Sequence, residues 1–448
     1  MLTGTRVYIN TLGCARNLVD SEVMAAALQR SGCRLTQDPA EAGVIVVNTC
    51  SFIGDAIKES IDTILELAGY KTGGHCRCFI VAGCLPQRFG PAIAEALPEV
   101  DVFLGTGALD QIVQAVAGEF TQGGCILPEP AALSLPTHQS GRKPSTYPMA
   151  YLKIGEGCNR HCTYCIIPKL RGRLRSRAAA DIVAEAETLY AEGMKEVVLI
   201  AQDTSAYGQD LETGENLARL LDKLARRAAA AGDCRLRFLY GSPDHTTAEL
   251  IRTIAEHPNI APYFDLPVQH VSNSLLRRMG RSYRSSDLLS LFADIRRAIP
   301  AATLRTTLLV GFPGETEAEF QELLDFVKEV EFDHLGVFAY SDAEDLASHH
   351  LPGHVPEEVA ARRCEQLMEQ QAQISRRKNQ NRVGEVVSAL VEDFVDPELY
   401  IGRTPFQAPE VDGVTYIASP GLAVGDFVAT RISEAYAYDL KGEAIWPA

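Results

Sequence analysis

Three closely spaced cysteines in the middle of the chain are well suited to bind a metal centre. Cys158, Cys162 and Cys165 lie in the run G-E-G-C-N-R-H-C-T-Y-C-I-I-P, which follows an apolar stretch with the pattern of a strand end. A structural zinc site and a cubane iron–sulfur cluster each take four ligands. Three thiolates would therefore leave one iron open to a group that is not protein. The alternatives are a zinc knuckle or three unrelated thiols, and His161 could be an additional ligand.

A second set of three cysteines occurs in the first third of the chain. Cys14, Cys50 and Cys84 each follow a short apolar, β-branched run, and a helix-like segment comes after each of them. Strands that alternate with helices predict a parallel sheet, in which the carboxyl ends of all strands lie at one edge. We therefore expect these three thiols to meet in space. Three ligands again predict a cluster with an open iron.

The remaining cysteines show no comparable pattern. Cys76 and Cys78 form a short H-C-R-C run with His75 that could bind a metal. Because Cys78 opens a predicted strand, we interpret both cysteines as structural. The same interpretation applies to the isolated cysteines, which are Cys33, Cys125, Cys234 and Cys364.

Length, charge and hydropathy define the class of protein. With 448 residues the chain can form two or three domains, and its formal net charge of -16 disfavours contact with a nucleic acid backbone. No apolar run approaches the roughly 18 residues of a membrane span, and the N-terminus lacks a signal-peptide pattern. We therefore expect a cytoplasmic protein without membrane contact, whose cysteines are ligands or core residues rather than disulfides.

Six apolar runs separated by helical segments predict an α/β barrel in the central part of the chain. The predicted strands span residues 150–154, 196–200, 236–240, 263–268, 303–310 and 334–340. Active sites of α/β barrels lie at the carboxyl ends of the strands, so the polar residues that follow the strands are candidates. These candidates are Gln202, Asp203, Thr204, Ser242, Asp244, Gln269, His270 and the segment 311–315.

The run R-G-R-L-R-S-R after the cysteine loop has arginines at alternate positions. In an extended chain, Arg171, Arg173, Arg175 and Arg177 would share one face. Two interpretations stay open. The run is either a solvated surface strand or a positive rim that attracts the carboxylates of a cofactor or substrate.

The other segments set the domain boundaries. Residues 121–147 are rich in Gly, Pro, Ser and Thr and predict a linker. Residues 341–356 predict a solvated loop rather than a metal site, although three histidines occur in it, and 356–380 predict a long helix. Short β runs after residue 381 predict a small β-barrel.

The C-x3-C-x2-C spacing of the cysteine loop resembles the signature of radical S-adenosylmethionine (SAM) enzymes. Three N-terminal segments resemble the methylthiotransferase family of these enzymes, namely T-L-G-C-A-R-N-L-V-D-S-E, N-T-C-S-F-I and A-G-C-L-P-Q-R. The resemblance implies that the loop cysteines hold a 4Fe–4S cluster that binds SAM, with Tyr164 near the adenine. It also implies that Cys14, Cys50 and Cys84 hold an auxiliary 4Fe–4S cluster, and that no side chain is a catalytic acid or base.

Within this family, the chain resembles the branch that modifies a ribosomal protein. The segments C-A-R-N-L-V-D-S-E, S-F-I-x-x-A-x-x-E-S and A-Q-D-T-S-A-Y-G are similar to that branch. The resemblance implies methylthiolation of an aspartate β-carbon on ribosomal protein S-twelve of the small subunit. The first cluster would generate a radical from SAM, and the auxiliary cluster would present the sulfur. An electron donor such as flavodoxin or ferredoxin is also implied.

The C-terminal segment resembles the TRAM module, which often binds RNA. Its acidic residues outnumber its basic ones, which favours a basic protein as partner, and we do not expect direct RNA binding. Two alternatives stay open: methylthiolation of a modified adenosine in tRNA, and a non-catalytic iron–sulfur protein that binds RNA.

The sequence as a whole predicts an α/β protein in four parts. These are an N-terminal methylthiotransferase domain with a parallel βα sheet (1–120), a linker (121–147), a radical SAM core with a partial (β/α)6 barrel and a connecting helix (148–380), and a small TRAM-like β-barrel (381–448).

Overall fold

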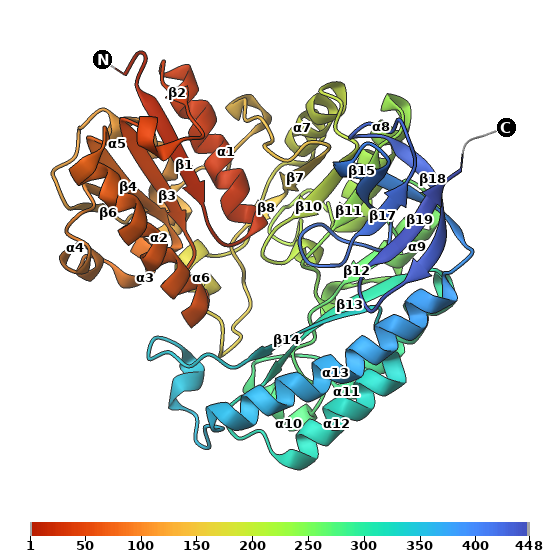
Figure 1. Ribbon diagram of the computed structural model, residues 1–448. Helices are drawn as coiled ribbons and strands as arrows, with labels where there is room; N and C mark the ends of the chain where they lie inside the picture. The colour runs from red at the N-terminus through yellow and green to blue at the C-terminus, as the bar shows by residue number, and fades with distance from the viewer. Residues whose placement is uncertain (1, 446–448) are drawn as a thin grey trace.

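The computed structural model describes residues 2–445, which form three packed parts in chain order. In Figure 1 the N-terminal part (red to orange) lies on one side of a central α/β part (yellow to light blue), and the C-terminal barrel (dark blue) packs against the central part. No helix in the described range is long and apolar enough to cross a lipid bilayer.

The N-terminal part is one parallel sheet with helices on both faces. In spatial order its strands are β2 (Arg34–Leu35), β1 (Arg6–Thr11), β3 (Val44–Thr49), β4 (Cys78–Gly83), β5 (Val102–Gly105) and β6 (Gly124–Ile126). Their alternating apolar side chains form two buried clusters, one on each face, against α1 (Ala15–Arg30) and α2 (Gly54–Gly73). The chain changes direction between β1 and β3, where open α/β sheets bind ligands.

Some elements of this part were not predicted. These are helix α3 (Cys84–Phe89), which begins at Cys84 itself, helix α5 (Ile112–Val116) and strand β6, whereas α4 (Ala92–Ala96) is the helix that we expected after Cys84. Strand β6 lies inside the segment that we expected to be a linker, and it extends the sheet. An edge strand needs few buried side chains, so this segment can form a strand despite its low apolar content. The hydrophobic pattern therefore did not predict it.

The central part is a partial barrel of six parallel strands. These are β7 (Met149–Lys153), β10 (Glu196–Ile200), β11 (Arg235–Phe238), β12 (Tyr263–Asp265), β13 (Thr303–Val310) and β14 (His334–Ala339). They pair as two three-stranded sheets, and a bridge between Leu236 and Ile260 joins the two. The helices are α7 (Ala179–Ala191), α8 (Leu217–Ala231), α9 (Ala248–Glu256), α10 (Asn273–Arg278), α11 (Ser285–Ala298), α12 (Glu317–Val330) and α13 (Glu357–Asn381). The predicted α/β barrel is confirmed.

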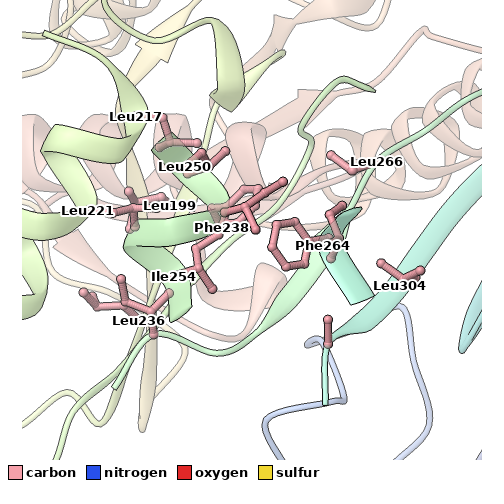
Figure 2. Packing of buried hydrophobic residues seen from close by; sticks show 14 of the residues in the cluster. Leu199, Leu217, Leu221, Leu236, Phe238, Leu250, Ile254, Phe264, Leu266 and Leu304 are labelled. Carbon is pink, nitrogen blue, oxygen red and sulfur yellow. The ribbon is translucent and has the colours of Figure 1, made fainter. Parts of the chain in front are cut away.

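Apolar packing holds the two halves of this barrel together where backbone pairing is sparse. Figure 2 shows Phe238 of β11 and Phe264 of β12 among buried leucines. Their rings meet edge to face, with centroids 6.0 Å apart and an interplanar angle of 89°. Such a pair adds about 0.5–1.5 kcal/mol to the stabilisation that comes from its buried area.

The C-terminal part is a closed β-barrel. Its strands, in order around the barrel, are β15 (Val386–Asp396), β16 (Leu399–Arg403), β17 (Thr415–Ala418), β19 (Leu440–Ala444) and β18 (Phe427–Ala435). The predicted small barrel is confirmed, with β19 as an additional strand.

The loop 404–412 between β16 and β17 enters the amino-terminal end of the central barrel. Ala408 is fully buried among residues of β7, β10 and β12. The carboxylate of Asp412 accepts a hydrogen bond of 2.5 Å from the hydroxyl of Tyr263, and His334 lies 2.8 Å from the carbonyl oxygen of Phe406. We call this loop the plug, because it fills that end of the barrel.

Two further segments fasten the N-terminal part to the central part. Arg142, in the expected linker, is buried between Glu22 of α1 and Glu185 of α7, at 2.6 Å from each. Asp345, in the segment 341–356, pairs with Arg88 of α3 at 2.7 Å.

The segment 341–356 is therefore partly an interdomain contact, and the expectation of a merely solvated loop is wrong for it. Leu346 in this segment is buried. Its side chain covers Cys84.

Candidate functional site

Cys14, Cys50 and Cys84, which we call the sheet triad, lie together at the carboxyl edge of the N-terminal sheet. Cys14 is the N-cap of α1, Cys50 directly follows β3, and Cys84 starts α3 after β4. Burial raises the pKa of Cys50 to about 11, and the two other thiols contribute to the increase. A Cβ on Gly13 would come within 2.5 Å of the Cβ of Cys50, so glycine is required for this approach.

Two guanidinium groups compensate the charge of the sheet triad. Nη2 of Arg171 donates to the sulfur of Cys84 at 3.4 Å. Burial alone would raise the pKa of Cys14, but Arg16 and Arg171 outweigh it and lower the pKa below the ordinary value of a thiol. The two guanidinium groups therefore shift Cys14 toward the thiolate, which is the form that binds metals.

Cys158, Cys162 and Cys165, which we call the loop triad, also lie together, beyond β7 and the short strand β8 (Gly155–Glu156). Burial raises the pKa of Cys165 to about 12, and the two neighbouring thiols add to this effect.

The backbone of the cysteine loop is held in place on both sides. The N–H of Cys158 donates to the carbonyl of Gly172, and that of Thr163 donates to Met279 after α10. His161, considered as an additional ligand, is exposed.

The donor sets fit iron–sulfur clusters with an open position. Each triad offers three thiols and no fourth protein sulfur, and within residues 2–445 no three His, Cys, Asp or Glu side chains are arranged to hold a single metal ion. Arg281 lies beside Cys162 and Cys165, and its Nε is buried without a hydrogen-bond partner. A buried donor without a partner fits a bound anionic group at this position.

Tyr164 lies between Cys162 and Cys165 in the cysteine loop. Its ring meets Phe312 edge to face at 6.4 Å, and its hydroxyl accepts a hydrogen bond of 2.5 Å from Arg281. Its proximity to the adenine of SAM stays a prediction.

A buried network of four charges connects the two triads. Lys153 pairs with Asp20 at 2.7 Å and with Glu156, while Arg171 lies 2.6 Å from Asp20 and 3.5 Å from Glu156. Burial alone would raise the pKa of Glu156, but Lys153 and Arg171 lower it to about 2. We did not single out Asp20, Lys153 or Glu156 from the sequence. Lys153 and Glu156 interrupt an apolar strand, and that interruption was the available signal.

The alternating arginines do not share one face, so both interpretations of the run are wrong as stated. Arg171 ends the helix α6 (Ile167–Arg171) and points to the sheet triad, whereas Arg173 is exposed. Arg175, in the short strand β9 (Arg175–Ser176), binds carbonyls of the expected linker, and Arg177 pairs with Asp181. A helical turn and a short strand replace the extended run.

The candidates after β10 and β11 gather around Arg160 of the cysteine loop. Arg160 pairs with Asp203 at 2.9 Å and with Asp244 at 2.7 Å, and Ser242 donates to Asp244. Gln202 instead donates to Glu156, and its Oε1 is buried without a partner. The hydroxyl of Thr204, the next candidate, donates a hydrogen bond to the backbone carbonyl of Leu239 inside the barrel.

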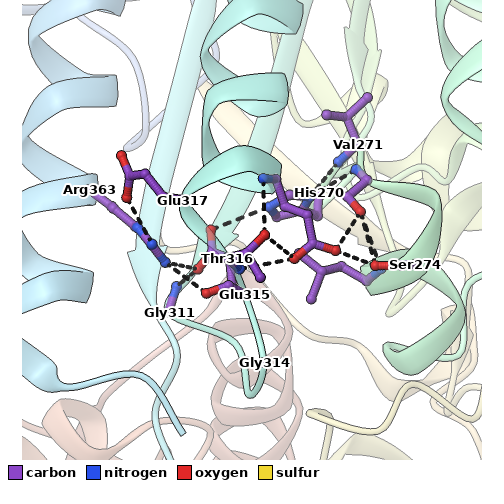
Figure 3. Close-up of polar contacts among 12 residues, drawn as sticks. His270, Val271, Ser274, Gly311, Gly314, Glu315, Thr316, Glu317 and Arg363 are labelled. Carbon is purple, nitrogen blue, oxygen red and sulfur yellow. Dashed lines mark hydrogen bonds and ion pairs between the residues drawn. The ribbon is translucent and has the colours of Figure 1, made fainter. Parts of the chain in front are cut away.

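The candidates after β12 and β13 form a separate structural network, shown in Figure 3. Nδ1 of His270 accepts hydrogen bonds from two backbone N–H groups, and its Nε2 lies 3.4 Å from Glu315. Glu315 also accepts from the N–H of Gly311 and pairs with Arg363 at 3.1 Å. Gln269 contributes only backbone hydrogen bonds. The segment 311–315 therefore fixes the end of β13, and its Phe312 packs against Tyr164 of the cysteine loop.

Comparison with known proteins gives matches along nearly the whole chain. Residues 6–105 match the family described as "Uncharacterized protein family UPF0004", residues 152–327 match the radical SAM superfamily, and residues 383–445 match the TRAM domain.

Solved structures of radical SAM enzymes share the fold. TsrM, a radical S-adenosylmethionine methyltransferase from Kitasatospora setae, has a TM-score of 0.58 at 16% identity over 75% of each chain. The cobalamin-dependent enzyme OxsB has a TM-score of 0.53 at 12% identity, over 83% of this chain and 58% of that chain. At these identities the likeness concerns the fold alone.

Relatives with much higher identity carry one common name. A ribosomal protein uS12 methylthiotransferase RimO from Desulfosudis oleivorans is 52% identical, over 98% of this chain and 100% of the relative. The protein of the same name from Clostridioides difficile is 43% identical, over 98% and 99%. The chain therefore belongs to the RimO family of radical SAM methylthiotransferases.

Proposed function

We propose that this chain transfers a methylthio group to the β-carbon of an aspartate on ribosomal protein uS12, by radical SAM chemistry. Its relatives are named for action on that protein, and the alignment covers them almost end to end. The observation that supports the chemistry best is the contact of Arg171 with Cys84, which joins the surroundings of the two triads. SAM cleavage needs only one open cluster, so the second set of three thiols supports a transfer of sulfur.

The residues of the two triads fit two 4Fe–4S clusters and SAM. The loop triad would hold the cluster that binds SAM, and the sheet triad would hold the auxiliary cluster. When bound, these groups supply one-electron cleavage of SAM and hydrogen-atom abstraction, for which no side chain is suited. The chain itself shields Cys84 from water, because Leu346 and Ile166 pack against it.

The acidic C-terminal barrel supports a basic protein as the macromolecular partner rather than RNA. We further propose an electron donor such as flavodoxin or ferredoxin. We place the protein in the cytoplasm, because its substrate belongs to the ribosome.

Anaerobic reconstitution followed by mass spectrometry tests this function. The enzyme is incubated with SAM, dithionite, sulfide and either purified uS12 or tRNA. We expect methylthio addition to an aspartate of uS12 and none to tRNA. Addition to tRNA alone would assign the chain to the other branch of the family, and absence of SAM cleavage to 5′-deoxyadenosine would leave a non-catalytic iron–sulfur protein.

A further inference from the structure

Arg16 lies between the sheet triad and the carboxyl ends of the central strands. Its Nη1 donates to the carbonyl of Ala201, directly after β10, at 2.9 Å. One face of the guanidinium covers the ring of Tyr240, with 4.4 Å between its central carbon and the ring centroid. The group also contacts the thiol of Cys14. The residue as a whole is partly exposed.

Four other cationic side chains around the triads are neutralised by carboxylates, whereas Arg281 beside the loop triad donates to the hydroxyl of Tyr164. Arg171 and Lys153 share Asp20 and Glu156, Arg160 pairs with two aspartates, and Arg88 pairs with Asp345.

Arg16 differs from this group. Within residues 2–445 it forms no ion pair with any carboxylate, and the carbonyl of Ala201 is its only oxygen acceptor. A guanidinium has five N–H donors, so Arg16 has donors left over beyond those that face Ala201 and Cys14.

The position of Arg16 is fixed from the side of the central barrel. Tyr240 has a left-handed backbone (φ 61°), which is uncommon for a large side chain. The N–H of Tyr240 donates to Asp265 at 2.9 Å, and its carbonyl accepts from Thr204 at 3.0 Å. The ring is thereby held under the guanidinium, which lowers the entropy lost when a ligand binds.

We propose that Arg16 binds the side-chain carboxylate of the residue that is modified, beside the sheet triad. A carboxylate matches the planar edge of a guanidinium with two parallel hydrogen bonds, which lysine cannot reproduce. Because Arg16 also contacts Cys14, a carboxylate held there places its neighbouring carbon next to the sheet triad. This inference rests on the proposed function, since it names the group by which that site recognises aspartate.

The experiment compares two enzymes with two substrates. Wild type and Arg16→Met are prepared as full-length apoproteins and as reconstituted enzymes. The substrates are purified uS12 and uS12 in which the target aspartate, identified by mass spectrometry, is replaced by asparagine. Dissociation constants of the apoproteins are measured by calorimetry, and KM and kcat are measured with the reconstituted enzymes. Arg252→Met is the matched control, because Arg252 is exposed on α9, away from the triads.

We expect wild type to bind aspartate-containing uS12 about 10- to 100-fold more tightly than the asparagine form. This is the effect expected when hydrogen bonds to a charged group are lost. Arg16→Met should lose this preference, with a raised KM for uS12, an unchanged KM for SAM and an unchanged iron content. Arg16→Lys should recover part of the preference. Arg252→Met should behave as wild type.

Two results would overturn the inference alone, namely a preference that survives in Arg16→Met, or an equal loss of affinity for both forms of uS12. A wild-type enzyme that cleaves SAM but never modifies uS12 would instead overturn the proposed function, and this inference with it.

Discussion

The guanidinium of Arg171 lies 3.4 Å from the sulfur of Cys84, although 87 positions separate the two residues in the chain. Arg171 ends the helix that follows the loop triad, and Cys84 belongs to the sheet triad. The helix that follows the loop triad therefore completes the surroundings of the sheet triad. The two sites are built as one unit, and the stability of their contact can be tested directly.

Replacing Arg171 should destabilise the contact between the two parts. In Arg171→Met the buried carboxylates of Asp20 and Glu156 share one remaining cation, Lys153. Breaking a buried ion pair in this way costs about 3–5 kcal/mol. Urea unfolding of the apoprotein should show this loss.

The control for this variant is Arg173→Met, because Arg173 is exposed two positions later. Its free energy of unfolding should change by no more than about 0.5 kcal/mol. Equal stability of Arg171→Met and wild type would contradict the importance of the buried network.

The two triads should fail separately when they are mutated. Alanine at all three positions of the loop triad should abolish SAM cleavage and lower the iron content from about eight to about four per chain. Alanine throughout the sheet triad should lower the iron content equally, keep SAM cleavage and stop methylthio transfer. Iron and sulfide analysis with 5′-deoxyadenosine assays measures both effects. If both triple variants kept all of the iron, the ligand assignment would be wrong.

Gly280 should be required for the shape of the cysteine loop. It has φ +76°, and a Cβ there would lie 2.6 Å from the carbonyl oxygen of His161. Gly280→Ala should therefore displace the loop, so that the cluster of the loop triad and SAM cleavage are lost together. Iron content and the electron paramagnetic resonance spectrum of the reduced protein measure this.

Gly193 provides the matched control, because it has φ +89° and open space around it. Gly193→Ala should cost about 1 kcal/mol of stability through backbone strain alone and should leave both clusters bound. Loss of iron in both glycine variants would show that strain, not the contact with His161, is responsible.

The docking of the C-terminal barrel should weaken in acid. Burial alone would raise the pKa of Glu196, but Arg403 and Arg237 lower it to about 2, from an ordinary value of 4.5. A lowered pKa stabilises the folded protein above pH 4.5, and this stabilisation is lost as the pH falls toward 2. Urea unfolding of the apoprotein between pH 7 and pH 2 should show the decline.

Glu196→Gln separates this effect from general acid unfolding. At pH 7 it should cost about 3–5 kcal/mol, because Arg237 is left buried without its carboxylate. The difference from wild type should shrink toward pH 2. Glu187→Gln, on a half-exposed side chain, is the control. A difference that is constant over the whole pH range would rule out Glu196 as the titrating group.

Much of this fold could be predicted, because the hydrophobic pattern of parallel strands is local. The runs before Cys14, Cys50 and Cys84 are apolar and β-branched, so the sheet and the meeting of its three cysteines follow from the rule that parallel strands end at one edge. The six barrel strands were found for the same reason.

Contacts between distant segments could not be predicted in this way. The alternation of Arg171 to Arg177 was interpreted as one extended face, but a helix ends at Arg171 and each guanidinium finds a different partner. Lys153 pairs with Asp20 of α1 and with Glu156 of β8. No periodic pattern in the sequence predicts such pairs. The plug was missed because it has no regular hydrophobic pattern, and strand β19 was missed because it is short and has only one large apolar residue, Leu440.

The plug has a consequence for how the protein is made. Residues 404–412, which occupy the amino-terminal end of the central barrel, leave the ribosome after all six of its strands. Until they arrive, Tyr263 and His334 lack the partners that the finished protein gives them. A chain that terminates before residue 404 would thus expose the residues of the central barrel that the plug covers, and proteases should degrade such a truncated product sooner than the complete polypeptide.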